Sequence, residues 1–260
     1  MFARAHALVR LGWLLFLRDF RLRFRQTYLG SLWAIGRVLF TGAPLILVGS
    51  HFGLGGERSP QSYAVFALAG LITWQMFWDA VVSPQWVARR MRKMLTEVAF
   101  PLEAVLVAGC CYVLFHAALY LVLVAAALAV FQVAPPLTLP LGLLAVPALV
   151  FAGVAVGMFF VPLTFVYLDF RYGLPFLSTV LLWTAPIFYV SPERGLLHEL
   201  NKWNPLTYLI DTPRHWLIAG PSGHEVMFVV CVGGFAVLFA AGLRFYRRAM
   251  PLAIERLPQR

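Results

Sequence analysis

The stretch RDFRLRFRQTYLGSLW at positions 18–33 decides how the chain is organised, because closely spaced arginines lead directly into an apolar run that can enter a bilayer. At 100° per residue, several arginines share an arc of roughly 80°, and aromatic side chains line a different arc. The arginines are Arg10, Arg18, Arg21 and Arg25, and the aromatic residues are Trp13, Phe16, Phe20 and Phe24. We therefore expect an amphipathic helix lying flat at a membrane surface, with its aromatic residues in the lipid and its arginines toward headgroups or a partner. The alternative is a juxtamembrane block of positive charge that only orients the chain.

The composition is that of an integral membrane protein. Of the 260 residues, 61% are hydrophobic and 12% are charged, whereas a soluble domain has about 25% charged residues. The mean hydropathy is +0.80. No polar stretch reaches the ~50 residues of a small soluble domain. The sequence therefore predicts a single transmembrane domain over residues 1–260.

The net charge and the cysteines exclude two classes of function. The formal charge is +10, but the basic residues cluster at the ends of apolar runs, as the positive-inside rule expects. We therefore expect them to face anionic lipid or a partner subunit, and we expect no nucleic acid. Cys110, Cys111 and Cys231 lie in apolar runs without disulfide or metal spacing, so we interpret them as small apolar packing residues.

Six apolar runs predict membrane-spanning helices. They cover residues 32–51, 62–86, 102–131, 141–168, 174–189 and 226–246. A very short inside turn at 169–172 joins the fourth to the fifth. The basic residues before the first run, around 89–93, at Arg171 and after the last run share one side if the number of spans is even. By the charge bias, that side and both termini are cytoplasmic.

The longest stretch outside these runs, 191–224, is too apolar for a free loop. We expect two short helices that dip back toward the outer leaflet and are separated near Asn204 and Pro205. Within it, Gly220 to Gly223 reads G-x-S-G, a nucleophile pattern of intramembrane proteases. No histidine that could act as its base follows on a later span. We therefore interpret Ser222 and Glu225 as a capping box for the last span.

Polar side chains inside two of the apolar runs indicate a passage. Arg37 lies within the first span, where a charge either faces the bundle interior or a water-filled path, or snorkels to the headgroups. Trp74, Gln75, Trp78 and Asp79 share one face of the second span. Aromatic rings stack on sugar faces, and amides or carboxylates bond hydroxyl groups. The alternative is ordinary helix packing with one interfacial acid.

The sequence contains no catalytic motif that we recognise. It lacks the G-x-x-x-x-G-K-[ST] loop that cradles ATP, and His198-Glu199 is not followed by the second histidine of a zinc protease. We therefore expect no catalytic residue, no metal site and no cofactor in this chain.

Four segments resemble the permease subunits of bacterial ABC-type polysaccharide exporters, which move O-antigen, capsule or teichoic acid chains. RDFRLRFRQTYLGSLWAIGRVLF at 18–40 resembles the opening of those subunits. EVAFPLEAVLVAG at 97–109, YLDFRYGLPFL at 167–177 and WNPLTYLIDTPRHWLIAG at 203–220 resemble later segments in the same order. The resemblance therefore covers nearly the whole chain.

This resemblance implies a homodimer of six-span subunits that works with two copies of a separate ATP-binding cassette ATPase, which would bind the ATP and magnesium. It implies an N-terminal interface helix over about residues 3–25. It also implies a coupling segment within residues 84–101 that contacts the ATPase. The substrate would be a glycan on an undecaprenyl diphosphate lipid, moved across the bacterial inner membrane.

Roles for individual residues follow as hypotheses. Arg18, Arg21 and Arg25 would attract the lipid diphosphate at the cytoplasmic opening, contact the ATPase, or anchor the helix. The coupling residues would be Arg89, Arg90, Arg92, Lys93 and Glu97. The passage would be lined by Arg37, Trp74, Gln75, Trp78, Asp79, Trp183 and Tyr189.

Three other functions are alternatives to glycan export. An ABC-type exporter of drugs or small lipids would share the same architecture. A membrane-embedded acyl- or glycosyltransferase would need clustered acids or histidines at one depth, which Asp79, Asp169 and the scattered histidines do not provide. A secondary transporter would usually show inverted repeats, and none is evident.

Overall fold

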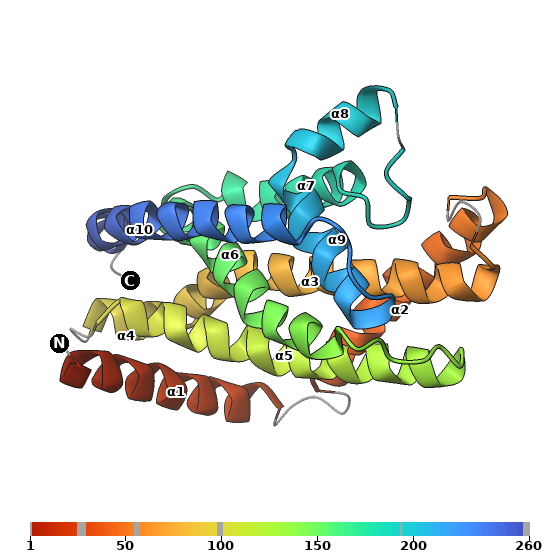
Figure 1. Ribbon diagram of the computed structural model, residues 1–260. Coiled ribbons are helices and arrows are strands. Elements are labelled where there is room, and N and C mark those ends of the chain that lie inside the picture. Colours follow the sequence, from red (N-terminus) through yellow and green to blue (C-terminus); the bar gives the residue numbers. More distant parts are fainter. Residues whose placement is uncertain (1, 25–29, 55–57, 98–100, 193, 257–260) are drawn as a thin grey trace.

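The computed structural model describes residues 2–24, 30–54, 58–97, 101–192 and 194–256, and these form a bundle of helices without strands (Figure 1). The expected all-α fold is confirmed. The helices are α1 (Phe2–Phe24), α2 (Leu32–His51), α3 (Pro60–Arg90), α4 (Arg92–Glu97), α5 (Glu103–Val130), α6 (Leu139–Val166), α7 (Asp169–Thr184), α8 (Leu196–Trp203), α9 (Pro205–Ile218) and α10 (Glu225–Glu255).

Five helices of the described chain are long and apolar enough to cross a membrane, namely α2, α3, α5, α6 and α10. The helix in the place of the fifth expected span, α7, has 16 residues. At 1.5 Å per residue it covers about 24 Å of a hydrocarbon core that is about 30 Å thick. The expected inside turn at 169–172 is wrong, because α7 already begins at Asp169 and the break falls at Tyr167 and Leu168. Six spans therefore stay a prediction.

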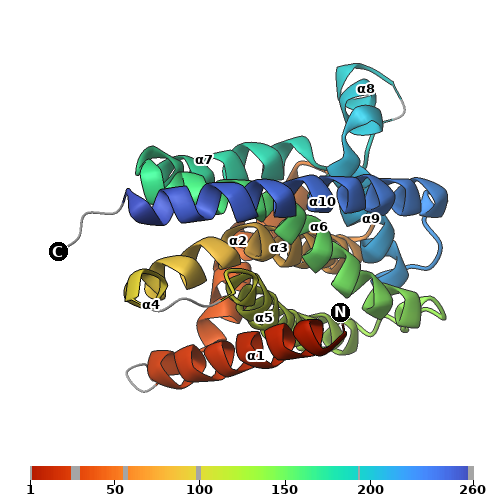
Figure 2. The same cartoon turned by 90° about the vertical axis from the view of Figure 1, so that its left-hand side faces the viewer.

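The central helix of the bundle is α3, which packs against α2, α5, α6 and α9 (Figures 1 and 2). Its side chains are buried along nearly the whole apolar stretch. The outer helices α2 and α10 expose large apolar residues instead, such as Phe40, which is 76% exposed. Such exposed apolar surface suits contact with lipid or with another membrane subunit.

The packing of α3 on α6 depends on two glycines spaced four residues apart. A Cβ atom on Gly153 would lie 2.3 Å from the carbonyl oxygen of Phe77, and one on Gly157 would lie 2.4 Å from that of Val81. Any larger residue would collide with the α3 backbone. The two backbones are therefore in direct contact, as small residues at this spacing allow in membrane bundles.

The N-terminal helix α1 runs alongside α5 (Figure 2). The ring of Phe16 packs edge-on against Tyr112 with centroids 4.9 Å apart, and Phe20 meets Phe115 at the same distance. Phe16 is buried, whereas Trp13 is half-exposed. The expectation that these aromatic side chains enter the lipid is therefore wrong for Phe16, because α5 offers it aromatic partners.

Two short helices, α8 and α9, fill the stretch expected to hold two. They meet at Asn204, whose side-chain oxygen accepts a hydrogen bond from the Leu206 amide and caps α9. The break therefore falls where it was expected. Helix α8 projects from the bundle (Figure 1), whereas α9 is packed against α3, α6 and α10. A re-entrant position in a membrane stays a prediction.

The start of α10 shows half of the expected capping box. Glu225 accepts a hydrogen bond from the Ser222 amide at 2.7 Å. The Ser222 hydroxyl accepts from the His224 amide, one residue short of α10. Glu225 therefore plays its expected part, and Ser222 stabilises the turn before the helix.

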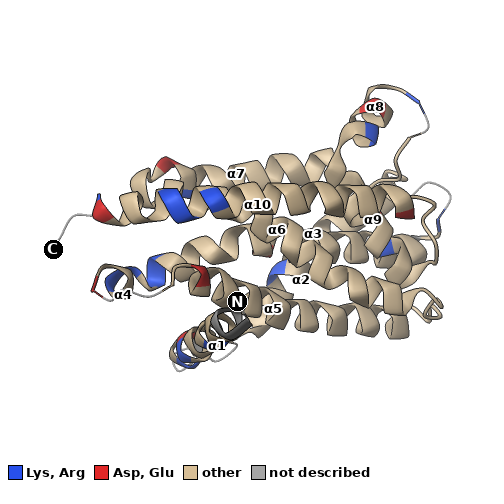
Figure 3. Cartoon of the chain, turned by 60° about the vertical axis from the view of Figure 1, so that its left-hand side comes forward, with Lys and Arg blue, Asp and Glu red and all other residues tan. Residues whose placement is uncertain are grey.

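Basic residues gather at one end of the bundle (Figure 3). Figure 3 shows Lys and Arg on α4 and on the last turns of α10, at the same end as both termini. We call this the basic end; the tips of α8 and α9 lie at the other end. The positive-inside rule predicts that the basic end is cytoplasmic.

Candidate functional site

A cleft of about 420 Å³ lies between α2, α3 and α7, and we call it the α2–α3–α7 cleft. Its walls mix aromatic rings, amides, hydroxyls and guanidinium groups. The lining residues are Arg37, Thr41, Leu71, Trp74, Gln75, Trp78, Val82, Gln85, Arg89, Arg171, Leu174, Pro175, Ser178, Thr179 and Leu182. The structure thus brings four predicted passage residues together, namely Arg37, Trp74, Gln75 and Trp78.

The two tryptophans of the cleft are stacked. They lie one helical turn apart on α3, which places the rings of Trp74 and Trp78 5.7 Å apart at an interplanar angle of 12°. Trp74 is 2% exposed and Trp78 is 7% exposed. Only the edges of this stack therefore reach the open cleft, and the rings also support the wall behind it.

Asp79 lies behind the cleft wall rather than in its lining. Its carboxylate accepts hydrogen bonds from Arg37 at 3.2 Å, from Gln75 at 3.0 Å and from the Tyr120 hydroxyl at 2.8 Å. His116 lies 3.6 Å away through Nδ1. A buried carboxylate needs such donors, since an unpaired charge in an apolar environment is costly. The network joins α2, α3 and α5.

This network decides between the two readings of Arg37. The guanidinium is half-exposed, with 50% of the side chain accessible, and it lines the cleft while bonding to Asp79. Arg37 therefore faces the bundle and the cleft, and its charge is balanced by an acid on the neighbouring helix.

Several cleft residues were missed from the sequence. Gln85 and Arg89 continue the face of Trp74 and Trp78 along α3, and extending the helical spacing past Asp79 would have found them. Gln85 is buried and donates to the Val81 carbonyl. Arg171 was missed because the apolar run was expected to begin at 174. The other α7 residues lie within that run and carry neither a charge nor an aromatic ring that would single them out.

Two predicted passage residues lie elsewhere. Trp183 is 53% exposed, and its ring packs near Phe188 with centroids 6.2 Å apart. The Tyr189 hydroxyl donates to Asn201 at 3.2 Å and so ties the segment after α7 to α8. Neither residue lines the α2–α3–α7 cleft. The structure therefore does not place them in one lining with Trp74, because Trp183 lies on the exposed side of α7 and Tyr189 lies beyond the end of that helix at Thr184.

The cleft continues toward the basic end. Arg89 and Arg171 line both the α2–α3–α7 cleft and an adjoining cavity of about 470 Å³, together with Trp86 and Arg90. Arg89 was assigned to ATPase coupling from the sequence, but the structure places it in the cleft wall. The guanidinium of Arg90 lies 4.6 Å from the Trp86 ring centroid, within cation–π range.

The other proposed coupling residues lie on α4. Arg92, Lys93 and Glu97 are exposed at the basic end. Three arginines were assigned to the cytoplasmic opening. The first, Arg18, donates to the Met94 sulfur at 3.1 Å, which joins α1 to α4. Arg18 and Arg21 also border a shallow cavity on α1. The third, Arg25, lies outside the described residues.

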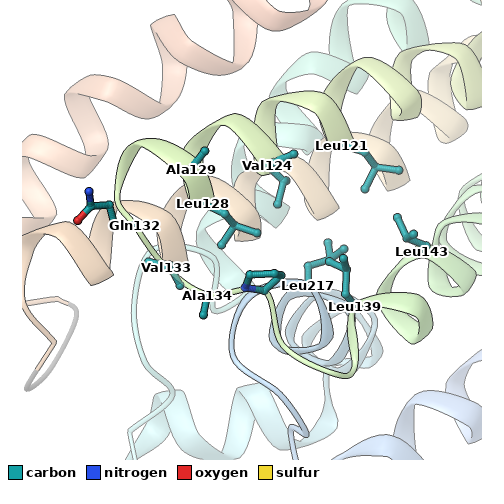
Figure 4. Close-up of a pocket in the computed structure, with 12 residues that line it drawn as sticks. Leu121, Val124, Leu128, Ala129, Gln132, Val133, Ala134, Leu139, Leu143 and Leu217 are labelled. Carbon is teal, nitrogen blue, oxygen red and sulfur yellow. The ribbon is translucent and has the colours of Figure 1, made fainter.

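An apolar pocket of about 610 Å³ lies between the α5–α6 turn and α9 (Figure 4). Figure 4 shows Leu121, Val124, Leu128 and Leu143 around the hollow, with the amide of Gln132 turned away from it. The pocket offers no titratable group, so it carries no acid–base or metal chemistry.

Long apolar helices, a polar cleft and a basic end define an all-helical, multi-pass membrane transport protein. The ABC-2 type transporter family matches residues 10–217, and the chain belongs to this family. It is the membrane subunit of an ABC exporter and has no catalytic role of its own; permeases of this family work with an ATPase partner, often as dimers. Comparison with curated proteins returned no match.

Proposed function

We propose that this permease moves a lipid-linked polysaccharide across the bacterial inner membrane, driven by two copies of a separate ATPase. The observation that carries this proposal is the α2–α3–α7 cleft, with its stacked Trp74 and Trp78 beside Gln75, Gln85 and hydroxyl groups. Support also comes from the resemblance of the ordered segments to polysaccharide export permeases.

The side chains of the cleft suit a sugar chain better than an apolar drug. Sugars present C–H groups, which pack against the accessible edges of Trp74 and Trp78, and hydroxyls, which bond with amides such as Gln75. Ser178 and Thr179 add hydroxyl partners from α7. A passage for drugs or small lipids would be expected to carry fewer hydrogen-bonding groups, as in most pockets for apolar ligands.

The basic end suits the lipid diphosphate. Arg89 on α3 and Arg171 on α7 both line the opening cavity, and guanidinium groups bind phosphate oxygens through paired hydrogen bonds. The proposal therefore adds these two residues to Arg18, Arg21 and Arg25 as candidates for the first contact with the lipid-linked substrate.

A second copy of the chain would complete the passage. The two helices that flank the cleft expose large apolar residues, including Phe40 on α2 and Phe176 on α7. Such residues suit a contact between membrane subunits. In this arrangement the two clefts face one shared path, and the ATPase subunits contact α4 at the basic end.

An export assay with matched variants tests the proposal. Reconstituted with its ATPase, Trp78→Ala should export an undecaprenyl-linked glycan at least about tenfold more slowly, and Ser178→Trp should block the cleft by bulk. Trp183→Ala is the control, because this tryptophan lies outside the cleft. All three variants must assemble with the ATPase at wild-type levels.

Two results would overturn the assignment. Normal glycan export by the assembled Ser178→Trp variant would mean that the glycan does not pass through this cleft. Transport of an apolar dye but of no lipid-linked glycan by the wild-type complex would favour the drug or small-lipid alternative.

A further inference from the structure

A second polar cavity, of about 430 Å³, lies between α8, α9 and the residues around Arg58 before α3; we call it the α8–α9 pocket. Its lining is distinct from that of the α2–α3–α7 cleft. The cationic and imidazole residues in it are Arg58, His198, Lys202, Arg214, His215 and His224.

Arg214 anchors this pocket. It is 2% exposed, and its guanidinium donates to the carbonyl oxygens of Pro186 and Ile187 and to the Asp211 carboxylate. The guanidinium carbon also lies 3.7 Å from the centroid of the Phe66 ring. A buried guanidinium held by these four contacts has a fixed orientation, as an anion-binding group requires.

Two residues of the lining each carry one buried polar atom that has no hydrogen-bond partner among the described residues. They are Nε of Arg214 and the hydroxyl oxygen of Thr207. Thr207 is 8% exposed. Buried donors are nearly always satisfied, because an unmade hydrogen bond costs about 1–3 kcal/mol. Nε of Arg214 can only donate and the Thr207 hydroxyl can donate or accept, so an acceptor that reached them would satisfy both.

The charges that line the pocket also favour a negatively charged ligand. Arg58, Lys202 and Arg214 are permanent cations, and Asp211 is the one acid among the described lining residues. Burial raises the pKa of Asp211, but hydrogen bonding from His215 and the charges of Arg214 and His215 outweigh burial and hold that pKa at about 2. Asp211 is therefore ionised but already paired, and the lining keeps an excess of positive charge.

We propose that the α8–α9 pocket binds one phosphate-class oxyanion. Phosphate offers several charged acceptor oxygens to Arg214 and Thr207, and it matches the planar donor fork of a guanidinium better than a neutral sugar does. Arg58 and Lys202 lie at the exposed side of the lining, where they would attract the anion. The site does not depend on what passes through the cleft.

The phosphate has two possible sources, a free anion or a lipid headgroup, and binding to the purified full-length chain separates them. In nanodiscs of neutral lipid, the wild-type chain should bind radiolabelled inorganic phosphate saturably. In the second arm, phosphatidylglycerol in the nanodisc should compete with that binding or, if the pocket takes only headgroups, should co-purify with the chain. Saturable binding of inorganic phosphate, or specific co-purification of phosphatidylglycerol, supports the pocket.

Four variants assign the binding to this pocket. Arg58→Gln and Lys202→Gln remove exposed charges and should each weaken binding about tenfold. Arg194→Gln is the matched control, since Arg194 is exposed near α8 but does not line the pocket, and it should bind as the wild type does. Arg214→Lys keeps the charge and loses Nε, and should also weaken binding.

The proposal fails if the wild-type chain binds neither probe saturably, or if Arg194→Gln weakens binding as much as Arg58→Gln and Lys202→Gln. Because Arg58 and Lys202 are exposed, these two variants decide the question even if Arg214→Lys does not fold. No transport is measured, so failure here leaves the role of the cleft standing, and failure of glycan export leaves the pocket standing.

Discussion

The carboxylate of Asp19 on α1 accepts a hydrogen bond from Arg90, the last residue of α3, at 3.1 Å. The hydroxyl of Tyr112 on α5 donates to the same oxygen at 2.9 Å. Asp19 is buried, whereas Arg90 keeps 41% of its side chain exposed, so the contact is shielded from water on one side only. The amphipathic helix, the central helix and α5 are thereby joined at the basic end, where the ATPase would act.

Exchanging these two charges tests that connection. Asp19→Arg and Arg90→Asp should each lower the unfolding temperature, since a hydrogen bond to a buried charge contributes about 2 kcal/mol, and each should reduce ATP-dependent export. The double variant should recover part of both losses, because the pair is restored in reverse. Arg92→Asp, on exposed α4, is the control for stability. A double variant no better than the worse single one would show that the pair itself is unimportant.

Replacing Asp79 should loosen the wall of the cleft. Asp79→Asn keeps the shape but removes the charge that balances Arg37, so we expect a loss of about 2 kcal/mol in unfolding free energy, limited by the partial solvation of Arg37. Thermal unfolding in detergent measures the change. Asp169→Asn, an exposed acid at the start of α7, should have little effect. An unchanged Asp79→Asn would mean that water satisfies Arg37 equally well.

The contact between α3 and α6 should tolerate no added methyl group. Gly157→Ala places a carbon against the Val81 carbonyl, and overpacking of this kind costs about 1–3 kcal/mol. Gly233→Ala on α10, where a Cβ meets nothing within 4 Å, should be neutral or slightly stabilising because alanine favours helix. Unfolding temperatures of the two variants in the same detergent give the comparison, and equal values would contradict the close packing.

The pH dependence of stability should carry a contribution from Asp211. Its pKa is depressed to about 2 in the folded chain, below the value of about 3.9 in an unfolded one. The stabilisation, about 2 kcal/mol, is thus fully present above pH 4 and is lost as the pH falls toward 2. Asp211→Asn should lack this component. Unfolding temperatures of both proteins should converge between pH 4 and 2; parallel curves would show that Asp211 is not paired in solution.

Local patterns in the sequence predict much of the fold. Apolar runs of bilayer length place α2, α3, α5, α6 and α10, and the Asn204-Pro205 pair places the break between α8 and α9. These features depend on hydrophobicity and on the backbone of neighbouring residues. The pattern does not say which helices touch, so the burial of Phe16 against α5 and the close α3–α6 contact at Gly157 could not be foreseen.

The candidate site is predictable to a similar extent. The spacing of Trp74, Gln75 and Trp78 indicates one polar face, and the structure places that face in a cleft. The position of Asp79 behind the wall depends on Tyr120 and His116, which lie on α5 and are far from Asp79 in the sequence. The α8–α9 pocket was missed altogether, because its charges come from separate segments that adjoin only after folding.

The backbone contact at Gly153 and Gly157 also restricts how the protein can work. Two helices whose backbones are in direct contact cannot easily slide past each other, so we expect α3 and α6 to move as one rigid unit. In α7, all of which is described, Leu174 is the one buried residue. We therefore expect α7 to move against the α3–α6 pair when the passage widens during transport.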